Sequence, residues 1–295
     1  MENNNQQKKK TNIYKILSYV FLLLAIIPLI YLVASRIQLH RLNMKSVTTY
    51  VEAQYSEEEL EKIKRQKEAY NKKVKTDFTP TTEPQHISDN DDTVIGVLYI
   101  PRIAEVIPIY FGTSDEILSK GVGIMEKTSL PGGMGSNCVL TGHRGTHNAK
   151  LFRYLDKLEM NDPVYIYTNN DLLKYKIFNH AVIQPDDGRL LTLEEDRDKI
   201  TLLTCTPYLI NTERLLYFGE RAKLTKSERD DVLDIIKNGN KKKLKQNSQM
   251  KDTNNREYSK VLYILAILVI ILLLLLIIYI LYRLLRNKDK EDKEE

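Results

Sequence analysis

The sequence predicts a mainly β fold: a closed barrel of short strands, preceded by helices and flanked by two transmembrane helices. Three observations support this prediction. After Val94, many short apolar segments of strand character are separated by turn-forming residues. Before them lies a charged stretch without Gly or Pro, from about Val51 to Lys75. Long apolar runs without a charge occur near both ends of the chain.

Each apolar run is long enough to cross a membrane. Residues 16–34 and 261–282 carry no charged side chain, and a helix of roughly 20 apolar residues spans the hydrocarbon core of a bilayer. Lysines precede the first run, and Arg283 and Arg286 follow the second, so we expect both termini in the cytoplasm and the middle outside. The first run can alternatively be a cleaved signal, but its length and the poor cleavage site at Leu32–Ala34 favour a retained anchor.

The predicted organisation has a helical region and a loop before the barrel. Ser56 and Glu59 form the pattern of a capping box, which starts a helix. Pro80 and Pro84 lie in a stretch rich in Thr and Asp that reads as a loop or lid. The expected segments are a cytoplasmic N-terminus (1–15), a transmembrane helix (16–34), a helical prelude (35–75), a lid or loop (76–93), the catalytic barrel (94–225), a C-terminal helix and tether (226–260), a second transmembrane helix (261–282) and a cytoplasmic tail (283–295).

The strands follow from short runs of β-branched and aromatic residues. Many short strands with few helices indicate a closed or nearly closed barrel. The predicted strands are Val94–Pro101, Val106–Tyr110, Cys138–Thr141, Val164–Tyr167, Leu173–Phe178, Ala181–Gln184, Ile200–Cys205 and Arg214–Leu224, and the predicted helices among and after them are Ser114–Lys120, Ala149–Leu158 and Leu224–Asn238.

The formal net charge of +5 needs no nucleic-acid partner to explain it. The lysine clusters at Lys8–Lys10 and Lys241–Lys245 flank the predicted spans, where anionic lipid headgroups attract them. Basic residues interleaved with aromatic ones, as in nucleic-acid-binding motifs, are absent. We therefore expect a lipid bilayer as a partner and no nucleic acid.

Cys205 is the first candidate reactive residue. It ends the apolar segment Ile200–Thr204, and Pro207 follows it closely. A strand end that faces a loop holds a reactive side chain rigidly while leaving it exposed. The alternative is a buried core thiol, against which Pro207 argues because proline ends the strand where the cysteine emerges. Cys138, within a short apolar strand, is expected to be such a core thiol.

His143 is in the same kind of position, directly after a predicted strand and a glycine. Imidazole exchanges protons near neutral pH, so His143 is the candidate proton carrier. His147 lies further into the same loop, and His180 is expected as a surface or turn residue between two strands. The histidines and the two cysteines match no zinc-binding spacing, so we expect no metal.

Arg214 lies nine residues after Cys205, at the start of the next predicted strand. An antiparallel return over this distance brings the two residues together. A guanidinium can hold a carbonyl oxygen or a developing oxyanion. An isolated arginine in a strand, however, is more often a surface charge.

Together these residues resemble the sortase family, and within it the pilus-building class C enzymes. Thr201–Cys205 is similar to the family's TLxTC signature, and Thr141–Gly145 is similar to its histidine motif. Two spans flanking the domain are also typical of class C. The resemblance covers most of the outward domain, and further segments that match the class C pattern are Cys205–Tyr208, Asn211–Thr212, Arg214–Leu215 and Ile109–Ser114.

The resemblance implies a cysteine transpeptidase that needs no cofactor. Cys205 would attack an LPxTG-like sorting signal of a pilin or surface protein, His143 would protonate the leaving amine, and Arg214 would hold substrate or oxyanion. A pilin lysine would resolve the thioacyl intermediate and so polymerise pili. The alternatives are transfer to a wall-peptide amine, a cysteine peptidase or wall hydrolase using water, and a non-catalytic anchored scaffold.

The resemblance also implies a lid over the active site. Class C lids carry an Asp-Pro-aromatic motif, and here Asp77 and Phe78 stand together without the intervening proline, with Pro80 following. Thr204 is assigned with Asp77 and Phe78 to the substrate-binding or lid group. The alternative for residues 76–93 is a solvated linker.

Overall fold

The structure is a computed structural model that describes residues 2–53, 55–77, 93–144 and 151–238. It divides into a unit of residues 35–250, which contains the barrel, and a unit formed by residues 1–34 with 251–295. The predicted second transmembrane helix (261–282) and most of the tether before it lie outside the described residues, as does the cytoplasmic tail (283–295).

The first helix, α1 (Glu2–Glu52), contains the predicted N-terminal span. Within the described part of the chain, Tyr19–Glu52 is the helical segment long and apolar enough to cross a membrane. Many of the large apolar side chains in its first part are exposed, among them Phe21, Ile27 and Tyr31. This helix is compatible with the expected anchor at 16–34, although a signal sequence has the same composition.

The single helix expected from about Val51 to Lys75 is in fact two helices. α1 ends at Glu52, and α2 runs over Glu57–Asp77. The predicted capping box marks the new start: the Ser56 N–H donates to Glu59 Oε2 at 2.8 Å, and the Glu59 N–H donates to Ser56 Oγ at 3.2 Å. Because these bonds satisfy backbone groups that the helix itself cannot, the chain restarts a helix at this position.

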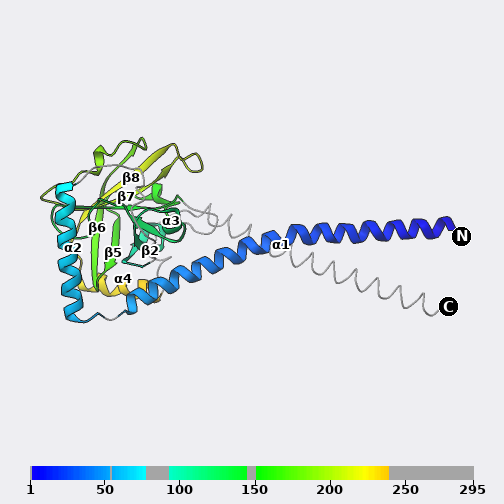
Figure 1. Cartoon of the computed structure of the whole chain (residues 1–295), viewed down its shortest axis with the longest axis horizontal. Helices are drawn as coiled ribbons and strands as arrows, with labels where there is room; N and C mark the ends of the chain where they lie inside the picture. Colours follow the sequence, from blue (N-terminus) through cyan, green and yellow to red (C-terminus); the bar gives the residue numbers. More distant parts are fainter. Residues whose placement is uncertain (1, 54, 78–92, 145–150, 239–295) are drawn as a thin grey trace. The chain divides into compact units, whose positions relative to one another are not determined.

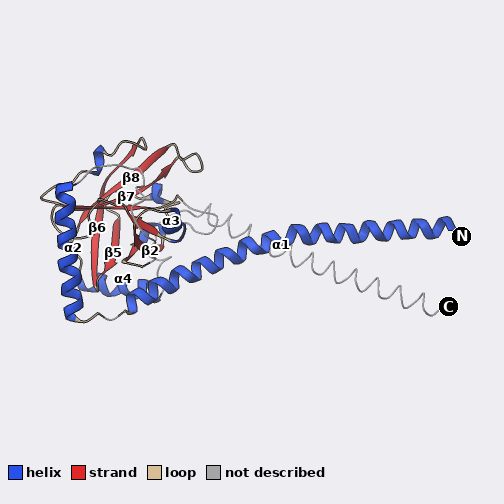
Figure 2. Cartoon of the chain, viewed as in Figure 1, coloured by secondary structure: helices blue, strands red, loops and turns tan. Residues whose placement is uncertain are grey.

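The barrel is closed, as predicted. Its strand order is β1-β2-β3-β4-β7-β8-β6-β5, with parallel pairing between β2 and β3 and between β4 and β7 and antiparallel pairing elsewhere. Figure 2 shows the strands forming the centre of this unit, with the longer helices outside them. The strands are β1 (Gly96–Ile100), β2 (Glu105–Phe111), β3 (Val122–Ile124), β4 (Ser136–Thr141), β5 (Pro163–Thr168), β6 (Asp171–Ile183), β7 (Asp198–Thr206) and β8 (Glu213–Arg221).

Two features of the sheet differ from the sequence prediction. β3 was not predicted, because three residues are too few to show a strand pattern. The strands expected at Leu173–Phe178 and Ala181–Gln184 are one strand, β6, whose register with β8 shifts between Ile177 and Asn179. A bulge of this kind inserts an extra residue without ending the strand, so His180 lies within β6 and not between two strands.

The short helices near the barrel are partly as expected. α3 (Asp115–Lys120) begins after Ser114, whose Oγ accepts a hydrogen bond from the Ile117 N–H. The α-helix predicted at Ala149–Leu158 is wrong for its described part, where residues 151–158 form turns and the 3-10 helix η2 (Leu155–Lys157). Phe152, Leu155 and Leu158 are nevertheless buried in the barrel core.

Helices pack around the outside of the barrel. Figure 1 shows α2 alongside the strands and α4 (Lys226–Asn238) below them. Ile235 and Ile236 of α4 and Val47 of α1 bury against Tyr99 and Tyr165 on the outer face of β1 and β5. Burial of this apolar surface ties both helices to the barrel.

α2 is fastened to the end of the barrel at which β4 begins. The Asn71 side chain donates to the Leu130 carbonyl at 3.1 Å and accepts from the Leu130 N–H at 2.8 Å. The Tyr70 ring packs edge-on against Phe111 with centroids 5.7 Å apart. His143 follows the opposite end of β4.

Candidate active site

Cys205 and Arg214 are paired across β7 and β8. Cys205 is the last residue but one of β7, Arg214 is the second residue of β8, and the antiparallel register sets one directly opposite the other. Residues paired in this way project from the same face of a sheet. Arg214 Nη1 donates to the carbonyls of Asn211 at 3.3 Å and Glu213 at 3.2 Å, which holds the guanidinium at the start of its strand.

The histidine segment lies on the other side of β7. β4 runs parallel to β7, and its last residue, Thr141, pairs with Leu203. The Gly142 N–H donates to the Leu203 carbonyl at 3.0 Å, so the register continues past the end of the strand. Continued for one more residue beyond the strand, this register would place His143 opposite Cys205. Parallel strands end at the same edge, which brings His143, Cys205 and Arg214 to one rim of the barrel.

The backbone on either side of His143 is held by hydrogen bonds. Thr204 Oγ1 donates to the Gly142 carbonyl at 2.7 Å, and the Phe152 N–H donates to the His143 carbonyl at 3.1 Å. A Cβ on Gly142 would lie 2.9 Å from side-chain carbons of Phe152 and of Val122, so only glycine fits here. These contacts fix the position from which His143 leaves the strand.

Thr204 is fully buried, and its hydroxyl donates to the Gly142 carbonyl. This bond supports the histidine segment. The assignment of Thr204 to the substrate-binding or lid group stays a prediction.

The two cysteines differ in accessibility. Cys138 is fully buried in the barrel core, as expected, while Cys205 is half-buried and neither forms a disulfide. Burial raises the pKa of the Cys138 thiol far above its ordinary value, because the charged form would lose its hydration. Cys205 is therefore the thiol that a substrate can reach.

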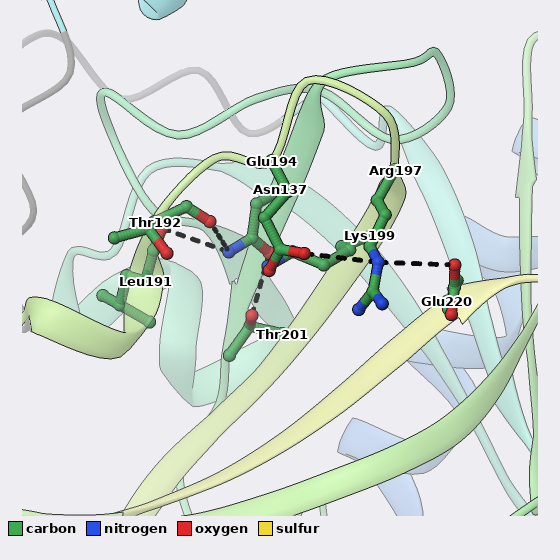
Figure 3. A network of polar contacts seen from close by, with 8 residues as sticks. All are labelled: Asn137, Leu191, Thr192, Glu194, Arg197, Lys199, Thr201 and Glu220. Carbon is green, nitrogen blue, oxygen red and sulfur yellow. Dashed lines mark hydrogen bonds and ion pairs between the residues drawn. The ribbon is translucent and has the colours of Figure 1, made fainter.

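A polar network missed by the sequence analysis fastens residues 184–197, which join β6 to β7 (Figure 3). Asn137 Nδ2 donates to the carbonyls of Leu191 at 3.1 Å and Thr192 at 3.2 Å, and Asn137 Oδ1 accepts from Thr201 Oγ1 at 2.8 Å. Glu194 forms ion pairs with Lys199, which is nearly fully buried, and with Arg197.

The same segment borders the candidate site. Leu191 is buried against Val139, Leu203 and Leu216. Leu203 and Cys205 are two residues apart in β7 and so project from the same face. Residues 184–197 therefore cover the part of this face next to Cys205.

The comparisons with known proteins agree with this geometry. The family model described as Sortase domain matches residues 98–222. The chain is similar to Streptococcus agalactiae sortase C1, whose crystal structure in complex with MTSET matches it with 36% sequence identity and a TM-score of 0.57. This match covers 63% of the present chain and 100% of the other chain. The chain belongs to the sortase family. Streptococcus pneumoniae sortase C is 35% identical with a TM-score of 0.57, over 62% of this sortase and 97% of that chain.

A curated relative gives a shorter match. Sortase D of Bacillus subtilis (strain 168) is 33% identical over 129 residues, which are 43% of this chain. The matched region spans 63% of that relative, so less than two thirds of its length is covered.

The other histidines of this sortase lie elsewhere or outside the described residues. His180 is exposed in β6, where its ring stacks on Tyr217 with centroids 5.3 Å apart. His147 lies outside the described residues. In the part of the chain that the structure describes, no group of three or more His, Cys, Asp or Glu side chains could hold a metal ion.

The side chains of the predicted lid residues lie outside the described part of the structure. Asp77 is the last residue of α2, and its side chain lies outside the description, as do Phe78 and residues up to 92.

An exposed apolar surface follows the cysteine. Tyr208, Leu209 and Ile210 are 42%, 78% and 66% exposed, in the turn between β7 and β8. The Arg153 guanidinium lies over the Tyr208 ring, 5.6 Å from its centroid. These apolar side chains lie within five residues of Cys205 in the chain. Sequence reasoning overlooked this surface, although the run Tyr208–Ile210 is itself a signal.

Proposed function

We propose that this sortase is a membrane-anchored cysteine transpeptidase that cleaves an LPxTG-like sorting signal. The observation that carries the proposal is the pairing of Cys205 with Arg214 on one side of β7 and the bonding of the His143 segment to the other side. A nucleophile, a proton carrier and a cation at one rim are the groups that acyl transfer requires.

In the proposed reaction, the Cys205 sulfur attacks the scissile backbone carbonyl while Arg214 holds the carbonyl oxygen as it becomes negative. His143 gives a proton to the leaving amine, and the C–N bond breaks to leave a thioester on Cys205. An incoming amine attacks this thioester and gives a proton to His143, a new amide bond forms, and the Cys205 sulfur leaves as the thiolate. No cofactor takes part in these steps.

We further propose that the acceptor is a pilin lysine, which makes the enzyme a class C sortase that polymerises pili. Sortase C1 and sortase C are among the similar solved structures, and the structure of the latter is described as giving insight into pilin substrate specificity. Two helices before the barrel and the apolar segments near both termini agree with the class C pattern. A wall-peptide amine and water are the competing acceptors.

The proposed location is the cell membrane, with the catalytic unit outside. Residues 16–34 and 261–282 would span the bilayer and leave both termini in the cytoplasm. The exposed apolar side chains of α1 support the first span. Reporter fusions to each terminus test this topology, and a periplasm- or surface-active reporter at either end would contradict it.

The test of the reaction uses the full chain with an LPxTG-like peptide and a lysine-bearing acceptor. Mass spectrometry should find an acyl adduct on Cys205 that disappears in Cys205→Ala, while Cys138→Ala, a matched substitution at the buried thiol, keeps most of the activity. An amide product supports transpeptidation. A free carboxylate in the presence of saturating amine would instead identify a peptidase, and loss of the adduct in Cys138→Ala alone would contradict the assignment of the nucleophile.

A further inference from the structure

Arg144 connects three segments around the candidate site. Its side chain is only 10% exposed, and it follows His143 directly in the chain. Arg144 Nη1 donates a hydrogen bond to Thr206 Oγ1, and Arg144 Nη2 forms an ion pair with Asp156 Oδ2 at 3.1 Å. One guanidinium therefore joins the segment after β4, the end of β7 and the 3-10 helix η2.

The hydrogen bond from Arg144 to Thr206 indicates how the segment after β4, which contains His143, is aligned with the end of β7, which contains Cys205. In the parallel register, Thr141 pairs with Leu203. Carried three residues further, the same register sets Arg144 against Thr206, and this is the pair that is hydrogen-bonded. The residues just before them, His143 and Cys205, are then aligned as well.

Neighbouring residues of an extended chain project to opposite faces. Thr206 and Cys205 therefore point to opposite sides of β7, and the bond from Arg144 is made behind the face that carries Cys205. Arg144 can hold the alignment of His143 and Cys205 without occupying the space where a substrate would bind.

The chemistry of the contacts suits arginine in particular. The planar guanidinium has donors on separate nitrogens in fixed, divergent directions and reaches two partners at once, whereas the three donors of a lysine ammonium share one nitrogen. The buried Nε of Arg144 has no hydrogen-bond partner among the described residues. A buried guanidinium with an unsatisfied donor stabilises a fold poorly. The presence of Arg144 is therefore better explained by the alignment that its contacts impose on the segments they join.

We propose that Arg144 is a positioning residue that holds His143 in register with Cys205 through Thr206 and Asp156. This inference rests on the proposed function, because it assumes that His143 and Cys205 act together. Arg144 itself touches neither the substrate nor the reacting atoms in this arrangement.

The experiment compares Arg144→Lys and Thr206→Val in the full chain, both in a Cys138→Ala background so that Cys205 is the single thiol. Arg144→Lys keeps the positive charge but loses the planar guanidinium with its separate donor groups. Thr206→Val keeps the side-chain shape but loses the hydroxyl. Arg102→Lys is the matched control, because Arg102 is also 10% exposed and pairs with Asp162 at 2.7 Å.

The readouts are kcat and KM for a sorting peptide, thermal unfolding, and the rate of Cys205 alkylation by iodoacetamide against pH. We expect Arg144→Lys to lower kcat by about 10- to 100-fold with little change in KM, because a small misplacement of catalytic groups is costly. Thr206→Val should lower kcat by about 3- to 10-fold, in line with one lost hydrogen bond. Both should shift the alkylation profile to higher pH, because a displaced imidazolium no longer favours the thiolate.

The control and the outcomes separate positioning from stability. Arg102→Lys should lower the unfolding temperature and leave the alkylation profile in place. If Arg144→Lys and Thr206→Val fold and keep the wild-type profile, the proposal is overturned; if Arg144→Lys does not fold, Thr206→Val decides alone. If no sorting peptide is cleaved by the wild type, the proposed function fails, but the alkylation profiles still test whether Arg144 aligns His143 with Cys205.

Discussion

Cys205 and Arg214 face each other across adjacent antiparallel strands, with Cys205 one residue before the end of β7 and Arg214 one residue after the start of β8. The turn between them contains Pro207 and the exposed residues Tyr208–Ile210. Because both residues belong to paired strands, the backbone of Arg214 is held opposite that of Cys205.

This pairing predicts that Arg214 stabilises the developing oxyanion. Arg214→Ala should lower kcat by about 10²- to 10³-fold, the usual cost of losing such a donor, and Arg214→Lys should recover part of it. Steady-state kinetics with a sorting peptide measure both, with Arg65→Ala on the exposed face of α2 as control. An Arg214→Ala enzyme with unchanged kcat would remove Arg214 from the mechanism.

His143, and not His147, should carry the proton. His143→Ala is expected to lower kcat/KM by about 10²- to 10⁴-fold because general acid catalysis is lost. His147→Ala and His180→Ala should retain most activity; His180 lies in β6, stacked on Tyr217. Thermal unfolding establishes that each variant is folded. Equal losses at His143 and His147 would leave the assignment without support.

Asn137 should be required to hold residues 184–197 beside the site. Asn137→Asp replaces an amide that donates to two carbonyls with a carboxylate that repels them. We expect a loss of about 3–5 kcal/mol in the free energy of unfolding, measured with urea, because the new charge is buried against the two carbonyls to which the amide donated. Asn179→Asp, at an exposed position of β6, should change it by less than about 0.5 kcal/mol. Similar effects at the two positions would contradict the anchoring role.

The attachment of α4 should weaken in acid. Glu228 accepts a hydrogen bond from Tyr165 and pairs with Lys174 at 2.6 Å. Burial alone would raise the pKa of Glu228, but the bonds from Lys174 and Tyr165 outweigh it and hold the pKa below its ordinary 4.5. A lowered pKa means that the carboxylate stabilises the fold above about pH 4.5, and that this contribution is lost as the pH falls through the folded-state pKa.

Glu228→Gln should therefore be less stable than the wild type at about pH 7, and the difference should shrink at about pH 3. Urea midpoints at the two pH values provide the measurement, with Asp196→Asn at an exposed position as control. A difference that stays constant between these pH values would exclude the linkage.

Local features of the fold were predictable because they depend on neighbouring residues. The capping box of Ser56 and Glu59 forms as expected, and the short helix expected at Ser114–Lys120 is α3. The closed barrel followed from the number of short strands. The bulge in β6 and the short β3 were not predictable, since their hydrogen bonds come from strands distant in the sequence.

The sequence by itself determined the family and the identity of the candidate groups, because motifs such as Thr201–Cys205 are contiguous and their chemistry belongs to the residue types. Only the tertiary structure decided how these groups are supported. Asn137 reaches Leu191 across 54 residues of chain, and Arg144 reaches Thr206 across 62. Such contacts arise when β4 pairs in parallel with β7, and a parallel register between separated strands is set by the closure of the whole barrel, which no short segment of sequence encodes.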